Sequence, residues 1–138
     1  MRKLAWIVAL AALVSLPAFA LASTNPNQVW VTNCFSSQYK PKLIVISCGD
    51  LSNFVQKLSW SSWSRTAAVA SGVDEFNSCE PNCASDKLTG VHATVTLTDP
   101  IHCKRRLHED FNRMELKFRG ESGPRSTQNV ILGCPLTQ

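Results

Sequence analysis

The chain has no strong excess of charge of either sign. Its 138 residues include 14 Lys and Arg against 10 Asp and Glu. Two of these cations, Arg2 and Lys3, stand in an N-terminal segment that we expect to be removed, which leaves 12 cations against 10 acids and a net charge near +2. A nucleic-acid-binding domain concentrates a basic face. We therefore expect no nucleic-acid partner.

Recognisable catalytic signatures are missing as well. The chain has three histidines and many serines, but no nucleophile elbow or other local signature surrounds them. The one compact acid–base group is Arg106, His108 and Glu109, and neighbours in a strand point to opposite faces of a sheet. The sequence therefore names no catalytic residue and favours a non-enzymatic domain. A small secreted hydrolase with a nuclease-like site stays open as an alternative.

An apolar run at the N-terminus indicates export. Arg2 and Lys3 precede the run Leu4 to Leu16, which is followed by Pro17 and the small-x-small sequence Ala20-Leu21-Ala22. This order is typical of a cleaved signal peptide. We predict a signal peptide over residues 1–22 and one secreted domain over residues 23–138, free outside the cell or held at the cell envelope. The run is shorter than the roughly 20 residues that cross a bilayer, so we expect no membrane span in the mature chain.

The downstream sequence alternates with a period of two, which is typical of strands. No internal repeat or low-complexity tract interrupts it. We predict an all-β fold in a single domain, either a sandwich or a partly open barrel of about seven short strands. The predicted strands cover residues 28–32, 42–47, 54–61, 66–73, 91–97, 111–118 and 129–132.

Three local features sharpen this prediction. Phe54, Leu58 and Trp60 share one parity, so we expect them on one buried face. A helical turn after Asp50 is an alternative start for that segment. The dipeptide Asp99-Pro100 is expected to end the strand over 91–97, because proline does not continue a central ladder.

Six cysteines follow the export signal, and an even count in a secreted chain predicts disulfides. Cys34, Cys48, Cys79, Cys83, Cys103 and Cys134 allow fifteen connectivities, and the sequence alone does not choose among them. A Cys-x3-Cys pair with His92, His102 or His108 has the residue types of a zinc site. Because no cysteine is left over, we favour oxidation and expect neither a metal nor another cofactor.

The sequence contains the blocks Cys48-Gly49-Asp50, Leu58-x-Trp60-Ser61-Ser62-Trp63 and Cys79-x-Pro81-x-Cys83-Ala84. These blocks resemble a family of small exported proteins that is abundant in actinobacteria, and the likeness covers about residues 29 to 118. Family members usually have glycine where this chain has Leu51, Ser64, and Ser85 or Asp86. The resemblance implies a bacterial exported domain and implies no activity.

The same resemblance bears on the disulfides. Cys103 and Cys134 lie outside the family pattern, so we expect these two to pair with each other. For the other four cysteines we prefer Cys34 with Cys48 and Cys79 with Cys83. An arrangement that links the first pair to the second stays open.

Four residues are candidates for binding. Lys104, Arg105 and Arg106 form the densest charge in the mature chain and suit an anionic partner, or else form a solvated hairpin tip. Trp63 is a candidate for stacking on a sugar or a partner surface, or else belongs to the core with Trp60. We predict a non-enzymatic binding domain whose partner is an envelope or extracellular protein or polysaccharide. A protease inhibitor acting through the Cys103 loop is a further alternative.

The export prediction has a direct test. Protein recovered outside the cells of its native host is expected to have the intact mass of residues 23–138 with six hydrogens fewer than the reduced chain, because the leader is cleaved and three disulfides form. Mass spectrometry before and after reduction measures both. Retention of residues 1–22 in most molecules contradicts the signal peptide.

Overall fold

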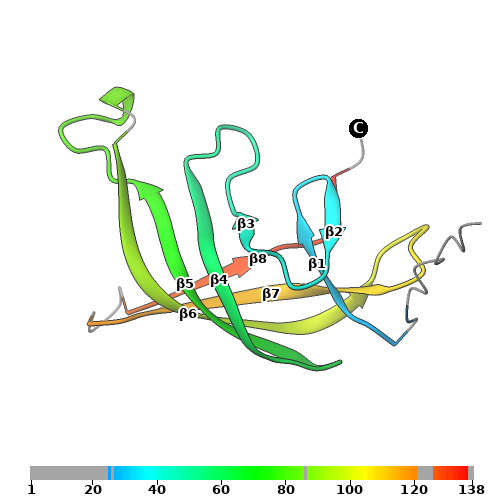
Figure 1. Ribbon diagram of the computed structural model, residues 1–138. Helices are drawn as coiled ribbons and strands as arrows, with labels where there is room; N and C mark the ends of the chain where they lie inside the picture. The colour runs from blue at the N-terminus through cyan, green and yellow to red at the C-terminus, as the bar shows by residue number, and fades with distance from the viewer. Residues whose placement is uncertain (1–24, 26, 86, 121–125, 137–138) are drawn as a thin grey trace, which may run out of the picture.

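One sheet of eight strands makes up most of the described chain (Figure 1). The structure is a computed structural model that describes residues 25, 27–85, 87–120 and 126–136, so the predicted signal peptide lies outside the described residues. A single 3-10 turn, η1 (Cys83–Ser85), stands in the loop between β5 and β6. The strands are β1 (Trp30–Asn33), β2 (Ser36–Gln38), β3 (Leu43–Val45), β4 (Asn53–Trp63), β5 (Ala67–Asn77), β6 (Leu88–His102), β7 (Glu109–Phe118) and β8 (Thr127–Ile131).

The strand order is β2-β1-β7-β6-β5-β4-β3, and β8 pairs with the same edge of β7 as β1 does, at residues further along β7. All neighbours are antiparallel except β1 and β7, which are parallel. The sheet curls strongly upon itself as a half-barrel (Figure 1). The all-β prediction is confirmed, and of the two predicted architectures the partly open barrel is the one observed. The short strand β2 lies outside the predicted strands, and β4 begins at Asn53 without a preceding helix.

Two irregularities in β4 change which side chains face the core. The pairing of β4 with β5 shifts between Gln56 and Ser59, where Lys57 has a φ of 55°, and shifts again between Trp60 and Ser62. Each extra residue reverses the alternation of faces. The prediction that Phe54 shares the buried face with Leu58 is therefore wrong. Val55 and Leu58 are buried, and Phe54 pairs with Glu75 on the outer face.

Strand β6 continues through Pro100, which corrects the prediction that it ends there. Its pairing with β5 stops at Thr98, whereas its pairing with β7 runs on through Pro100 to His102. Beyond Thr98 the strand has a neighbour on one side only, and at such an edge the missing N–H of proline leaves no bond unmade. Asp99, with a φ of 58°, marks the irregularity at this point.

The core fills one part of the half-barrel. The inner face of β5 carries small residues, Ala68, Ala70 and Gly72, against which longer side chains of the neighbouring strands pack. A Cβ on Gly72 would lie 2.9 Å from Leu58 Cδ2 and 3.0 Å from the Gln56 carbonyl oxygen, so the tight curl of β4 over β5 requires glycine. The buried apolar residues are Val29, Val31, Ile44, Val55, Leu58, Ala68, Ala70, Ala93, Val95, Leu97, Phe111, Met114 and Leu116.

A side-chain bridge joins β1 to β3, the two strands that would otherwise lie apart at the seam. Asn33 donates through Nδ2 to the Leu43 carbonyl oxygen (3.0 Å) and accepts through Oδ1 from the Val45 N–H (3.0 Å). The amide group therefore makes both bonds that a neighbouring backbone peptide would make. The Cys34–Cys48 disulfide lies directly beside this bridge and closes the same seam covalently.

The disulfides pair as preferred: Cys34 with Cys48, Cys79 with Cys83, and Cys103 with Cys134. The second closes a loop of five residues beyond the ends of β5 and β6, and the third ties the β6–β7 turn to the C-terminal segment. Three disulfides are compatible with an extracellular-type domain in an oxidising compartment. Within the described residues, no helix has the length and apolarity needed to cross a membrane.

The Asn33 bridge predicts a stability effect. Asn33→Ala is expected to lower the free energy of unfolding by about 1 to 2 kcal/mol, because the Leu43 carbonyl and the Val45 N–H both lose their partner. Denaturant titration of the oxidised protein measures the change. Asn112→Ala is the matched control, since among the described residues that side-chain amide bonds only to the exposed Asp99 carboxylate. An equal loss in both variants would contradict a special role for the bridge.

Candidate functional site

The basic turn predicted from the sequence joins β6 to β7 at one end of the sheet. Lys104 and Arg105 are exposed, and the Arg106 N–H donates to the Cys103 carbonyl oxygen at 3.1 Å, which closes the turn. Leu107, beside them, is 89% exposed. Within the described part of the chain, none of the three cations forms an ion pair. Their charge is therefore free to act on an external partner.

A histidine next to this turn connects it to an aromatic ring. The imidazole of His108 stacks on Trp30, with ring centroids 4.8 Å apart and an interplanar angle of 24°. Its Nε2 lies 3.8 Å from Oδ2 of Asp110, a fully buried carboxylate that accepts no hydrogen bond from the described residues. The imidazole therefore lies next to both the Trp30 ring and a buried carboxylate.

From Trp30 the aromatic contacts continue toward Trp63. The Tyr39 ring lies 6.2 Å from Trp30 and 5.1 Å from Trp63, and the ring of Trp60 lies 4.6 Å from that of Trp63. The second irregularity of β4 brings both tryptophans to the inner face, instead of the opposite faces that an unbroken strand would give them. Tyr39 is 41% exposed and is the member that solvent reaches most easily.

Trp63 is held firmly in this cluster. Its Nε1 donates to the Val29 carbonyl oxygen at 2.9 Å, and its ring meets Phe111 edge-on with centroids 5.6 Å apart. It is partly buried and packs against the core. Trp63 therefore packs against the Tyr39 ring and helps to hold it in place, and the exposed part of the Trp63 ring adds to the surface.

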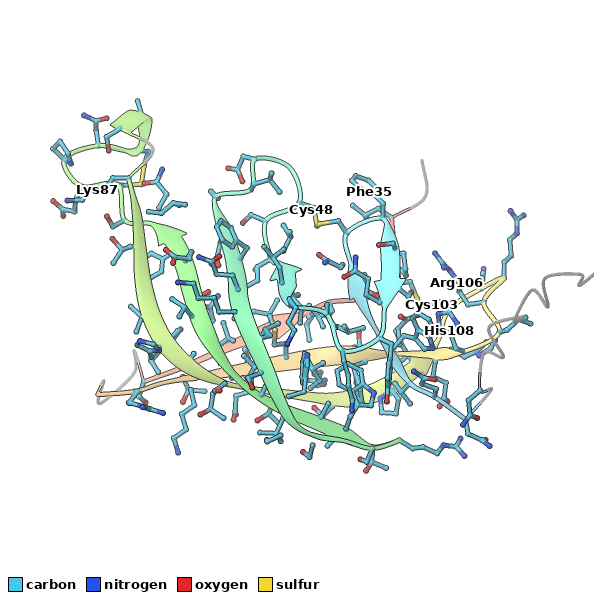
Figure 2. The ribbon with its side chains drawn as sticks, in the orientation of Figure 1. Phe35, Cys48, Lys87, Cys103, Arg106 and His108 are labelled. Atoms are coloured by element: carbon cyan, nitrogen blue, oxygen red, sulfur yellow. A yellow bond between two sulfur atoms is a disulfide. The ribbon has the colours of Figure 1, made fainter. Side chains whose placement is uncertain are left out.

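The sequence-predicted residues thus gather at one end of the molecule. We call the rings and cations at this end the aromatic–basic surface. It consists of Trp30, Tyr39, Lys40, Lys104, Arg105, Arg106 and His108. Lys40 belongs to it because its Nζ lies 5.4 Å from the centre of the Tyr39 ring. Figure 2 shows Arg106, Cys103 and His108 close together, at the opposite end of the molecule from Lys87. Sequence reasoning missed Trp30, Tyr39 and Lys40, because the parallel pairing of β1 with β7 that brings Trp30 beside His108 leaves no local signal.

Among the described residues, neither acid beside the turn forms an ion pair with Lys104, Arg105 or Arg106. Glu109 Oε2 lies 4.0 Å from Arg65 Nη2, and Asp110 is fully buried with its Oδ2 facing His108 Nε2. The Arg106, His108 and Glu109 group considered for hydrolysis does not converge, because the carboxylate that faces His108 is Asp110. Among the described residues, no three His, Cys, Asp or Glu side chains gather in a way that would hold a metal ion. The inhibitor hypothesis for the Cys103 loop stays a prediction.

A second feature, not predicted from the sequence, lies at the other end of the β6–β7 ladder. A cavity of about 680 Å³ opens where the apolar core stops, near the pairing of Ala93 with Phe118. The basic turn follows the pairing of His102 with Glu109 at the far end of the same ladder. The described residues lining the cavity are Ser47, Ser52, Asn53, Asp74, Phe76, Asn77, Val91, Phe118, Thr127 and Gln128.

Asp74 is the unusual residue of this cavity. It lies on the inner face of β5, in line with Ala70 and Gly72, and is 1% exposed. Its Oδ1 and the Oδ1 of Asn53 are both buried without a hydrogen-bond partner among the described residues. Burial, and secondarily the negative charge of Glu75, raise the pKa of Asp74 to about 6.

Comparison with protein-family models, with curated proteins and with solved structures gives no match for this chain. The resemblance to the exported actinobacterial family therefore stays a prediction. Conclusions about function rest on the two sites themselves.

The raised pKa of Asp74 predicts a pH-dependent stability. The folded state prefers the protonated carboxyl of Asp74. The contribution of this preference to the free energy of unfolding is complete below pH 3.8 and is lost as the pH rises through about 6. Asp74→Asn is expected to raise the free energy of unfolding at pH 7.5 by about 1 to 2 kcal/mol, since one pKa unit corresponds to about 1.4 kcal/mol and water in the cavity screens part of the effect. The gain is expected to disappear below pH 4.

Thermal or denaturant unfolding at several pH values measures this dependence. Asp99→Asn is the matched control, because hydrogen bonds from Asn112 and then Arg113 lower the pKa of that exposed carboxyl. Its neutralisation is expected to give no gain at pH 7.5. An Asp74→Asn variant that is less stable than the parent at pH 7.5 would contradict the assignment of a destabilising buried charge.

Proposed function

We propose that this protein is an exported, non-enzymatic binding domain that holds an acidic polysaccharide of the cell envelope or the extracellular medium through its aromatic–basic surface. The observation that carries the proposal is the position of three cations, Lys104 to Arg106, next to the stacked rings of His108 and Trp30; none of the three has an ion-pair partner among the described residues. The three disulfides support a place outside the cytosol.

The chemistry of an acidic sugar matches this combination. The C–H face of a pyranose packs on an aromatic ring, as other apolar surfaces do, and the half-exposed ring of Tyr39 offers such a platform. Carboxylate or sulfate groups along the polymer pair with guanidinium groups, which donate hydrogen bonds to two oxygens side by side. Exposed cations also attract a polyanion over a distance that depends on salt.

Trp63 takes a supporting part in this proposal. Its indole hydrogen bond to Val29 and its edge contact with Tyr39 fix the orientation of the Tyr39 ring. A ring that is already fixed loses little conformational entropy when a ligand packs on it. The proposal therefore assigns direct contact to Tyr39 and Trp30, and positioning to Trp63.

The test is retention of the protein on immobilised alginate, a carboxylated polymer, at low ionic strength. Replacement of Lys104, Arg105 and Arg106 by Ala is expected to weaken binding about tenfold or more, and Tyr39→Ala is expected to weaken it severalfold, because the first removes the charge and the second removes the ring. Raising the salt to about 0.5 M is expected to release the parent protein.

Matched controls separate this surface from general charge. Replacement of the exposed Lys57, Lys87 and Lys117 by Ala removes the same charge from other parts of the molecule and is expected to leave most of the binding. Neutral dextran is expected to retain neither the parent protein nor the triple variants. Equal losses in the two triple variants, or no binding to alginate at low salt, would reject the proposal.

A further inference from the structure

We infer that the cavity at the open end of the half-barrel is a second binding site, which takes a small molecule carrying a protonated primary amine. The site is separate from the aromatic–basic surface and independent of the proposed function, since the two lie at opposite ends of the β6–β7 ladder.

The hydrogen-bonding groups of the cavity call for a donor. Asp74 Oδ1 and Asn53 Oδ1 are acceptors, both buried and both without a partner among the described residues. An unpartnered buried acceptor costs free energy that a bound donor recovers. A primary ammonium group carries three donors on one atom and forms the stronger, charge-assisted kind of bond with a carboxylate.

The charge of the cavity favours a cation over a neutral donor. Asp74 is the only charged side chain among the described lining residues. Glu75 lies next to it in the chain and adds a second negative charge from the outer face, where Gln56 Nε2 bonds to its carboxylate at 3.0 Å. On the neighbouring strands, the charged and titratable side chains nearest in register are Lys57 of β4 and His92 of β6, both exposed on the outer face. Lys117 and Arg119, on either side of the lining residue Phe118, are exposed, as is Asp50 in the loop that carries Ser47 and Ser52. Strand β8 has no charged or titratable side chain.

Apolar walls surround this polar centre and define the rest of the ligand. Phe76, Val91 and Phe118 line the cavity around Asp74 and are each partly buried. The volume of about 680 Å³ lies in the range of cavities that enclose a small organic molecule. An aromatic or alkyl body on the amine would fill the space between these walls, and an aromatic ring would gain edge or offset contacts with the phenylalanines.

Binding of an ammonium group is linked to the proton on Asp74. The ligand pairs with the carboxylate and not with the protonated acid, so binding releases the proton from a carboxyl whose pKa lies at about 6. Affinity is therefore expected to be nearly constant above pH 7 and to fall about tenfold between pH 7.5 and pH 5. The amine itself stays protonated throughout this range.

The experiment uses three probes that share one ring and differ in the head group: benzylamine, benzyl alcohol and benzoate. Calorimetry or ligand-observed NMR with the full chain, purified oxidised, is expected to detect benzylamine at pH 7.5 with an affinity at least tenfold above that of benzyl alcohol, and no benzoate. Asp74→Asn is expected to lower the affinity for benzylamine at least tenfold and to abolish the pH dependence of that affinity.

Two controls make the result decisive. Glu75→Gln removes the neighbouring charge from the outer face and is expected to change benzylamine affinity less than threefold, which separates contact from a general field. The melting curve of Asp74→Asn verifies that the variant is folded when binding is measured. Three outcomes would overturn the inference: equal binding of benzylamine and benzyl alcohol, full binding of benzylamine by Asp74→Asn, or no benzylamine binding at concentrations up to about 10 mM. None of these outcomes bears on alginate binding.

Discussion

The bridge made by the Asn33 side chain is the interaction on which the shape of the sheet depends. Strands β1 and β3 stand at positions two and seven in the strand order, and the Asn33 amide joins them by imitating a backbone peptide. The Cys34–Cys48 disulfide adds a covalent link beside it. This seam holds the loop that carries Tyr39 in place, and the Tyr39 ring contacts the rings of Trp30 and Trp63. The curl and the aromatic–basic surface therefore have one origin.

The seam closes only part of the barrel, and the interior changes character along its length. Strand β3 pairs with β4 alone and β8 pairs with β7 alone, so the described strands leave an opening between them. Below the Asn33 bridge the interior is packed with apolar side chains around Phe111 and Leu97. Toward the opening, the inner face of β5 changes from Ala68 and Ala70 to Asp74, and the packed core gives way to a cavity. One continuous sheet thus encloses a packed apolar core at one end and a polar cavity at the other.

Much of this architecture could be predicted from the sequence, because alternation and cysteine count are local properties. The alternation over 111–118 predicts β7 well, and the three cysteine pairs form as preferred. The irregularity at Lys57 was beyond reach, since one residue with positive φ reverses the faces and leaves no mark in composition. Asp74 was missed because the predicted strand ended one residue before it. The strand in fact continues to Asn77 and turns the carboxylate inward, in line with Ala70.

The two candidate sites differ in how strongly the fold itself accounts for them. Exposed cations at a hairpin tip keep a sheet edge soluble at little cost, so Lys104 to Arg106 have a structural use even without a ligand. A buried carboxylate has no such use. Burial raises the pKa of Asp74, which means that the folded state carries an unfavourable charge at neutral pH. Asparagine has nearly the same shape and carries no charge. An acid held in this way, in a cavity where Asn53 adds a second acceptor without a partner among the described residues, stabilises nothing in the isolated chain at neutral pH and is best explained by a cation that the chain receives from outside.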